Sequence, residues 1–250
     1  MDENARTVLT LGGADVSAFL QNLVTNDIAD IDGRLVYAAL LTPQGKYLAD
    51  FFVTEQDGQV LLDVASALAP GLAQRLTMYK LRADVTIAES DLKVLQGDGP
   101  LPEGALPDPR HPSLGWRLYG TESGNRIADW DARRVAAMVP ETGVELLPND
   151  SYILEHGFER LKGVDFRKGC YVGQEVTARM KHKTDLRKGL ARVQIAGRAK
   201  TGDAITAAGK PVGTLHTVAG DAGLAYVRFD RAQGILRAGD AEIRMAGDGS

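Results

Sequence analysis

The chain has a single cysteine, Cys170, and the segment around it holds the residue types best suited to chemistry. Arg167 and Lys168 precede it, and Gly169 and Gly173 let the backbone turn tightly and approach a ligand. A helix that begins near Gly173 would place the thiol close to the positive end of a helix, beside two cationic side chains. Both influences would stabilise a thiolate. The alternative is a small buried hydrophobic residue.

Metal and hydrolase chemistry find little support in the sequence. One cysteine cannot form an intrachain disulfide, and structural zinc and iron–sulfur sites usually take several thiolate or imidazole ligands. The four histidines show no HxxxH or HxH spacing, so we predict no autonomous metal site. His182 follows Cys170 in the chain, but nothing requires the two to meet. A self-contained cysteine hydrolase is therefore the weaker interpretation.

Basic side chains are crowded between residues 160 and 188, where nine Lys and Arg residues stand against three Asp and Glu residues. Such a run is typical of a solvated face. The functional alternative is an anion-binding surface for a polyglutamate tail, a phosphate backbone or an acidic partner. Tyr171 is the only aromatic ring in the motif around the cysteine, so no stacking ladder accompanies the charges. This argues against direct nucleic-acid binding.

The length and composition of the chain limit the class of protein to which these residues belong. The chain has 250 residues, 44% of them hydrophobic and 25% charged, which is ordinary for a globular protein of one large unit or two to three lobes. The net charge of −4 gives no overall basic surface. No run of 18 apolar residues exists, so we predict no contact with a membrane. The acidic start resembles neither a signal nor a transit peptide, and we predict a cytoplasmic protein.

Hydrophobic periodicity predicts mixed helices and strands in the N-terminal part. Apolar residues at helical spacing over 16–24 predict a first helix, with Asp15 as its cap. Alternating or continuous apolar runs separated by turns predict an antiparallel meander, over residues 35–41, 47–53 and 60–64. Two further helices are expected over 70–81 and 130–138. The stretch 97–115, rich in Gly and Pro, predicts a loop or a boundary between lobes.

After Gly189 the sequence changes to short β-like runs separated by glycines, over residues 190–195, 204–208, 211–218, 222–229 and 242–245. This spacing predicts a small antiparallel β-barrel lobe. Because helices and strands alternate without a βαβ rhythm elsewhere, the fold class is α+β. We expect one α+β region over 1–185, with its two lobes divided near 97–115, and a barrel lobe over 186–250.

The octapeptide at 168–175, Lys-Gly-Cys-Tyr-Val-Gly-Gln-Glu, resembles the signature of the folate-binding YgfZ family, which includes a related mitochondrial iron–sulfur assembly factor. The pattern of that family is K-G-C-[FY]-x-G-Q-E, and every specified position is met. Weaker resemblance extends to Phe19–Asp27 and to the turn Thr42–Lys46. The resemblance implies a tetrahydrofolate-binding protein that assists assembly or repair of iron–sulfur enzymes, with the assembly machinery or its client proteins as partners.

The YgfZ family in turn resembles the glycine-cleavage T-protein, a folate-dependent aminomethyltransferase. That resemblance implies several lobes around a central channel. Residues 152–158 look like a T-protein segment whose glutamate contacts the pterin, and Glu155 is the matching position. A carboxylate suits the role because it accepts two parallel hydrogen bonds from the amino-pyrimidinone edge. Of two adjacent T-protein aspartates only Asp50 is kept, which argues against ordinary glycine cleavage; the resemblance implies that Asp50, like Glu155, contacts the folate in the channel.

The resemblance also implies roles for the rest of the motif. Cys170 is expected to face the channel as a reactive or exchangeable thiol. Lys168 would hold it as a thiolate or bind the carboxylate tail of folate, and Tyr171, Gln174 and Glu175 would contact ligand or fix the loop. Two alternatives remain open: a one-carbon transferase close to the T-protein, and an RNA-binding or tRNA-modification accessory protein that uses the basic segment.

Overall fold

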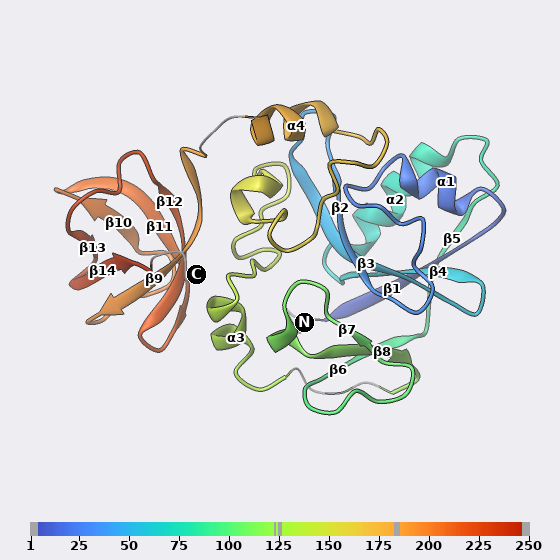
Figure 1. The fold of residues 1–250 in the computed structure, drawn as a ribbon, viewed down its shortest axis with the longest axis horizontal. Coiled ribbons are helices and arrows are strands. Elements are labelled where there is room, and N and C mark those ends of the chain that lie inside the picture. The colour runs from blue at the N-terminus through green and yellow to red at the C-terminus, as the bar shows by residue number, and fades with distance from the viewer. Residues whose placement is uncertain (1–4, 123, 125–126, 183–185, 247–250) are drawn as a thin grey trace.

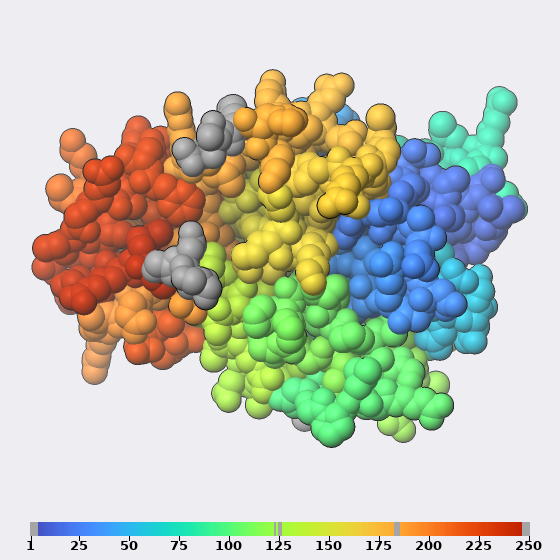
Figure 2. All heavy atoms as spheres, in the orientation of Figure 1, coloured from blue at the N-terminus to red at the C-terminus, as the bar shows by residue number. Residues whose placement is uncertain are grey.

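The computed structural model describes residues 5–122, 124, 127–182 and 186–246. Within them the strands form a five-stranded sheet, a three-stranded sheet and a closed six-stranded barrel. The two sheets and most helices gather on one side, and the barrel stands on the other (Figure 1). The space-filling view shows the barrel in broad contact with the segment between α3 and η2 (Figure 2). The α+β prediction and the C-terminal barrel are confirmed.

The five-stranded sheet has the order β2-β3-β4-β1-β5, and all its neighbouring strands are antiparallel. Two helices, α1 and α2, cover one face. The side chains of β2 alternate between two cores: Ala38 and Leu40 pack with these helices, and Tyr37 and Leu41 pack on the other face. The sheet therefore lies between two hydrophobic cores. The elements are β1 Arg6–Gly12, α1 Val16–Gln21, β2 Val36–Leu41, β3 Tyr47–Gln56, β4 Gln59–Ala65, α2 Ala69–Lys80 and β5 Thr86–Glu89.

The predicted meander is confirmed as β2, β3 and β4. The first helix is shorter than predicted and ends at Gln21. The prediction that Asp15 caps it is wrong, because Asp15 makes no capping hydrogen bond. Its carboxylate instead accepts from the backbone N–H of Asp84 at 2.8 Å, which ties the start of α1 to the approach of β5. Strand β1, which pairs with both β4 and β5, was not predicted.

A three-stranded sheet follows, in the order β6-β8-β7. The stretch 97–115, predicted as a loop or boundary, connects β6 to β8 and contributes β7 and a short 3-10 helix. Gly115 has φ +71°, and a Cβ there would stand 2.0 Å from the carbonyl oxygen of Gly97, so only glycine fits. The elements of this central part are β6 Lys93–Gly97, β7 Leu106–Pro107, η1 Pro112–Leu114, β8 Trp116–Gly120, α3 Trp130–Ala136, η2 Ile153–His156 and α4 Gln174–His182.

The barrel closes in the order β10-β11-β12-β9-β14-β13. Its strands alternate buried and exposed residues, and the inward residues form a separate hydrophobic core. Five of the six strands match predicted runs, while the three-residue β13 was too short to recognise. The strands are β9 Lys188–Ala196, β10 Ala204–Ala207, β11 Lys210–Ala219, β12 Ala222–Arg228, β13 Leu236–Ala238 and β14 Ala241–Met245.

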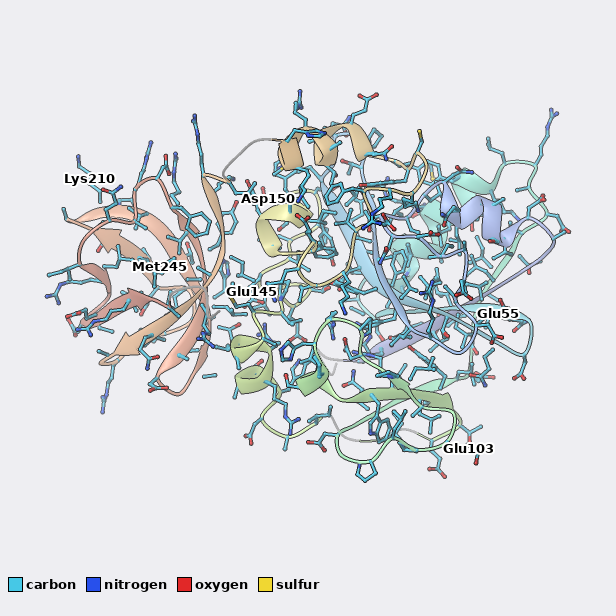
Figure 3. The ribbon with its side chains drawn as sticks, viewed as in Figure 1. Glu55, Glu103, Glu145, Asp150, Lys210 and Met245 are labelled. Atoms are coloured by element: carbon cyan, nitrogen blue, oxygen red, sulfur yellow. The ribbon has the colours of Figure 1, made fainter. Side chains whose placement is uncertain are left out.

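A buried charged cluster joins the barrel to the central part. Arg134 of α3 donates to Glu145 at 2.9 Å and to the hydroxyl of Thr217 on β11 at 2.7 Å. That hydroxyl in turn donates to Glu145. All three residues are buried, and Glu145, labelled in Figure 3, lies between the barrel and the rest of the chain. Each polar atom named here has a partner, which buried ionic groups require.

We predict that Arg134→Ala lowers the free energy of unfolding by about 3–5 kcal/mol, because it leaves the Glu145 carboxylate buried without its counter-ion. The neighbouring Arg133 is the matched control: its pair with Asp98 is solvent-exposed, so Arg133→Ala should cost about 1 kcal/mol or less. Urea unfolding of both variants measures the difference. Equal losses would contradict the assignment of the buried cluster.

Candidate functional site

The segment that carries Cys170 is held to the first lobe by a clamp between residues 24–26 and 162–168. The Thr25 hydroxyl donates to the carbonyl of Gly163 at 2.7 Å and accepts from the N–H of Ala39. The Asn26 amide donates to the carbonyl of Lys162 at 2.7 Å. The backbone N–H of Asp165 donates to the carbonyl of Thr25 at 3.0 Å. The clamp thus ties residues 24–26 to the segment that leads into the cysteine motif.

Lys168 completes this clamp. Its ammonium group donates to the backbone carbonyls of Val24 and Asn26, both at 2.7 Å. Burial lowers the pKa of Lys168 to about 8, against the opposing carboxylates of Asp27 and Asp165. The side chain predicted to hold a thiolate or a folate carboxylate is thus engaged by backbone oxygens. Its direct role in the structure is to fix the start of the motif.

A close contact of two turns fixes the other end of the motif. Gly173 has φ +84°, and a Cβ there would lie 2.6 Å from the carbonyl oxygen of Thr42. Across the same contact, a Cβ on Gly45 would lie 2.8 Å from Val176. Only glycines allow the turn 42–46 to meet the start of α4. Helix α4 begins at Gln174, close to where the sequence predicted it.

Between these two fixed ends, Cys170 is exposed. The alternative of a small buried hydrophobic residue is therefore wrong, while the reactive thiol stays a prediction. Tyr171 beside it is buried, and its hydroxyl makes no hydrogen bond of normal geometry within the described part of the chain. The Gln174 amide reaches the carbonyl of Gly169 at 3.4 Å, and Glu175 is exposed at the first turn of α4. The chain thus presents a thiol to solvent on an anchored loop.

Asp50 lies elsewhere, in a cavity where the two sheets meet α3. Its carboxylate accepts hydrogen bonds from the hydroxyls of Tyr47 at 2.6 Å, Thr142 at 2.6 Å and Tyr37 at 2.9 Å. Burial and the adjacent Asp50 raise the pKa of both tyrosines well above their ordinary value, so they remain donors. Asp50 is only 5% exposed, so it does not lie on a solvated face of its strand.

Four arginines line the same cavity: Arg6, Arg110, Arg117 and Arg134. Each is paired with a carboxylate; Asp63, for example, accepts from Arg6 at 2.6 Å and from Arg117 at 2.9 Å. The sequence does not predict any of the four as a site residue. They come from β1, the β7–η1 loop, β8 and α3, and no spacing in the sequence links these segments.

Glu155 is not among the residues that line this cavity. Its carboxylate accepts a hydrogen bond of 2.5 Å from the hydroxyl of Tyr226 on β12, and the ammonium of Lys188 lies 3.7 Å away. Burial and this bond raise the pKa of Tyr226. His156 stacks on the Tyr226 ring at 5.3 Å, and burial lowers its pKa. The structure thus places Glu155 at the junction with the barrel, apart from Asp50 and Cys170.

The cavity fits a pterin neither in its hydrogen bonding nor in its size. The Asp50 carboxylate already accepts from three hydroxyls, and the Gln96 amide lies within hydrogen-bond distance of the Arg117 guanidinium. The enclosed volume is about 50 Å³, room for a few water molecules, whereas small-molecule pockets enclose about 300–1,000 Å³. As it stands, the cavity does not admit the ring system.

Comparison with known proteins gives the family. The iron–sulfur cluster assembly factor IBA57 of Homo sapiens, named as mitochondrial, is 31% identical, and the match covers 93% of this chain and 78% of that protein. The chain belongs to the CAF17/IBA57 family. A homologue from Mycosarcoma maydis is 34% identical over 73% of this chain, which spans only 54% of that protein. The family described as CAF17, C-terminal beta-barrel domain, matches residues 187–247. YgfZ is a related family, so the predicted resemblance is confirmed at this coarser level.

The fold comparison agrees with the predicted T-protein likeness. The aminomethyltransferase T of the glycine cleavage system from Bartonella henselae superposes with a TM-score of 0.73 at 13% identity, over 98% of this chain and 83% of that one. At this identity the likeness shows the fold alone. None of the described helices combines the length and apolar character needed to cross a membrane. The CAF17/IBA57 relatives carry mitochondrial names, so the cytoplasmic prediction stays a prediction.

Proposed function

We propose that this protein assists the assembly of iron–sulfur proteins and presents Cys170 to the machinery or client it serves. Membership in a family whose members are named iron–sulfur cluster assembly factors supports the role. The exposure of Cys170 between two anchored ends carries the assignment of the site. A thiolate is a natural iron ligand, and one cysteine alone leaves coordination positions for a partner.

In cells that lack the protein, we expect the wild type to restore the cluster content of iron–sulfur enzymes and Cys170→Ser to fail. The serine keeps the shape of the side chain and removes the sulfur. Ser17→Ala, an exposed change on α1, is the matched control and should restore fully. Iron and acid-labile sulfide in a purified client enzyme give the readout. Full restoration by Cys170→Ser would exclude a role for the thiol.

We also propose tetrahydrofolate as the ligand of the Asp50 cavity. Support comes from the T-protein fold and the buried carboxylate. Binding requires the lining to move apart and the hydroxyls to release Asp50, since the enclosed volume is about 50 Å³ and the carboxylate is already engaged. The same cavity would serve a one-carbon transferase, and turnover of a methylamine-type donor with folate would distinguish that alternative. No observation in the structure favours an RNA-binding role over these.

Calorimetric titration with tetrahydrofolate tests this site. We expect Asp50→Asn to weaken binding at least tenfold, about 1.4 kcal/mol, and Cys170→Ala to bind as the wild type does. Two variants test whether Glu155 contacts the ligand or only accepts the hydrogen bond from Tyr226. If the Glu155 carboxylate contacts the ligand, Glu155→Ala weakens binding. Tyr226→Phe removes only the hydrogen bond to that carboxylate and leaves binding unchanged. Failure of the wild type to bind would contradict the folate proposal and leave the cysteine loop unaffected.

A further inference from the structure

A groove lies on the segment that leads into the cysteine motif. Its volume is about 470 Å³, and it is lined by residues of 159–167 together with Asn26 of the first lobe. Figure 2 shows this segment, in yellow, at the surface beside the blue first lobe. The central cavity, by comparison, encloses about 50 Å³. The groove can therefore hold a ligand without any movement of the chain.

The lining of the groove combines apolar side chains with a fixed backbone. Val164 is buried, and Phe166 is half-buried. The Asn26 amide donates to the carbonyl of Lys162 at 2.7 Å, so the clamp that holds the cysteine loop also holds the groove. The ammonium of Lys181 on α4 lies 5.4 Å from the centroid of the Phe166 ring. The groove is thus preformed, as small binding sites on proteins usually are.

Two cations of the groove have no carboxylate partner. Lys162 and Arg167 are both exposed, and neither side chain makes an ion pair or hydrogen bond with any residue that the structure describes. The two carboxylates of the lining are already engaged. Glu159 pairs with Lys181, and Asp165 accepts from the backbone N–H of Arg167 at 2.6 Å. Positive charge is therefore available in this groove for an anionic ligand.

The backbone of Lys162 is strained. Its φ of +54° lies in the left-handed region, which glycine adopts freely and a lysine does not. The N–H of Lys162 donates to the carbonyl of Glu159 at 3.1 Å, which fixes this conformation together with the bond from Asn26. Strained residues of this kind gather at functional sites. A glycine would relieve the strain but remove the ammonium, so the chain holds a charge here at a cost in stability.

We propose that the groove binds an acidic segment of the protein that Cys170 serves. Carboxylates of that segment pair with Lys162 and Arg167. An apolar side chain of the segment packs against Val164 and Phe166. Arg167 stands three residues before the cysteine, so a docked segment leads the partner toward the thiol. This inference rests on the proposed function and names the chemistry of the partner.

The lining favours a protein segment over a nucleic acid. Phe166 is the only aromatic ring among the described residues that line the groove, so successive bases find no stacking platform. The preformed backbone lowers the entropy that docking costs. Because Lys162 and Arg167 are exposed, salt should screen their attraction for the segment.

Fluorescence anisotropy tests the groove with a labelled glutamate-rich peptide that has a central leucine. The wild type should bind it at low salt and lose affinity as sodium chloride is added, and the matching glutamine-rich peptide should not bind. Lys162→Gly and Arg167→Gln should each weaken binding, and the double variant should weaken it at least tenfold, about 1.4 kcal/mol. Equal binding by the double variant, or by the glutamine-rich peptide, would overturn the proposal.

Two controls separate lost binding from lost folding. Lys162→Gly suits the left-handed backbone, so its Tm should not fall below that of the wild type. Lys210→Gln changes an exposed lysine on the barrel, labelled in Figure 3, and should bind the peptide as the wild type does. Equal weakening by Lys210→Gln would overturn the groove as the binding site.

Two further comparisons identify the occupant and separate this proposal from the proposed function. An RNA oligonucleotide with the charge of the peptide should bind more weakly; tighter binding would overturn the acidic segment in favour of a nucleic acid. Cys170→Ser should bind the peptide normally. In cells, Lys162→Gly/Arg167→Gln should restore less cluster to client enzymes than the wild type. Full restoration by that double variant would overturn the docking site and leave the role of Cys170 standing.

Discussion

The site depends on the clamp between residues 24–26 and the segment 162–168. A loop that must expose a thiol cannot anchor itself by burying that thiol, so its anchoring groups lie on either side. Thr25 supplies one side chain that both donates and accepts, and Lys168 supplies an ammonium that spans two carbonyls. Since a buried polar group left without a partner costs about 1–3 kcal/mol, each of these bonds strongly favours one loop position.

Charge inside the central cavity imposes a second constraint. Arg6, Arg117 and Asp63 form one unit on the sheets, and Arg110 with Asp108 forms another on a surface loop. Buried ion pairs add little net stability, yet breaking one is expensive. Arg117 also lies 3.7 Å from Asp108 and so links the two groups of charges. The cost of breaking a buried ion pair also holds the barrel in place, because Arg134, Glu145 and Thr217 satisfy one another's hydrogen bonds at its contact with the central part.

The sequence predicted those features that local pattern determines. The continuous apolar run that became β2, the glycine at 173 ahead of α4, and five of the six barrel strands follow from hydrophobic pattern and backbone freedom. Features that depend on distant segments were missed. The cavity arginines are far apart in the chain, and Glu155 meets Tyr226 only after the barrel docks. Asp15 does not cap α1, because its carboxylate accepts instead from the backbone N–H of Asp84, which lies far away in the sequence.

Amide hydrogen exchange of Thr25→Val tests the central claim most directly. The substitution keeps the shape of the side chain and leaves the N–H of Ala39 and the carbonyl of Gly163 without their partner. We predict at least tenfold faster exchange over residues 163–170, about 1.4 kcal/mol of local stability, with the barrel over 188–245 unchanged. Unchanged exchange in the cysteine loop, or an equal rise in the barrel, would contradict the claim that this clamp positions Cys170.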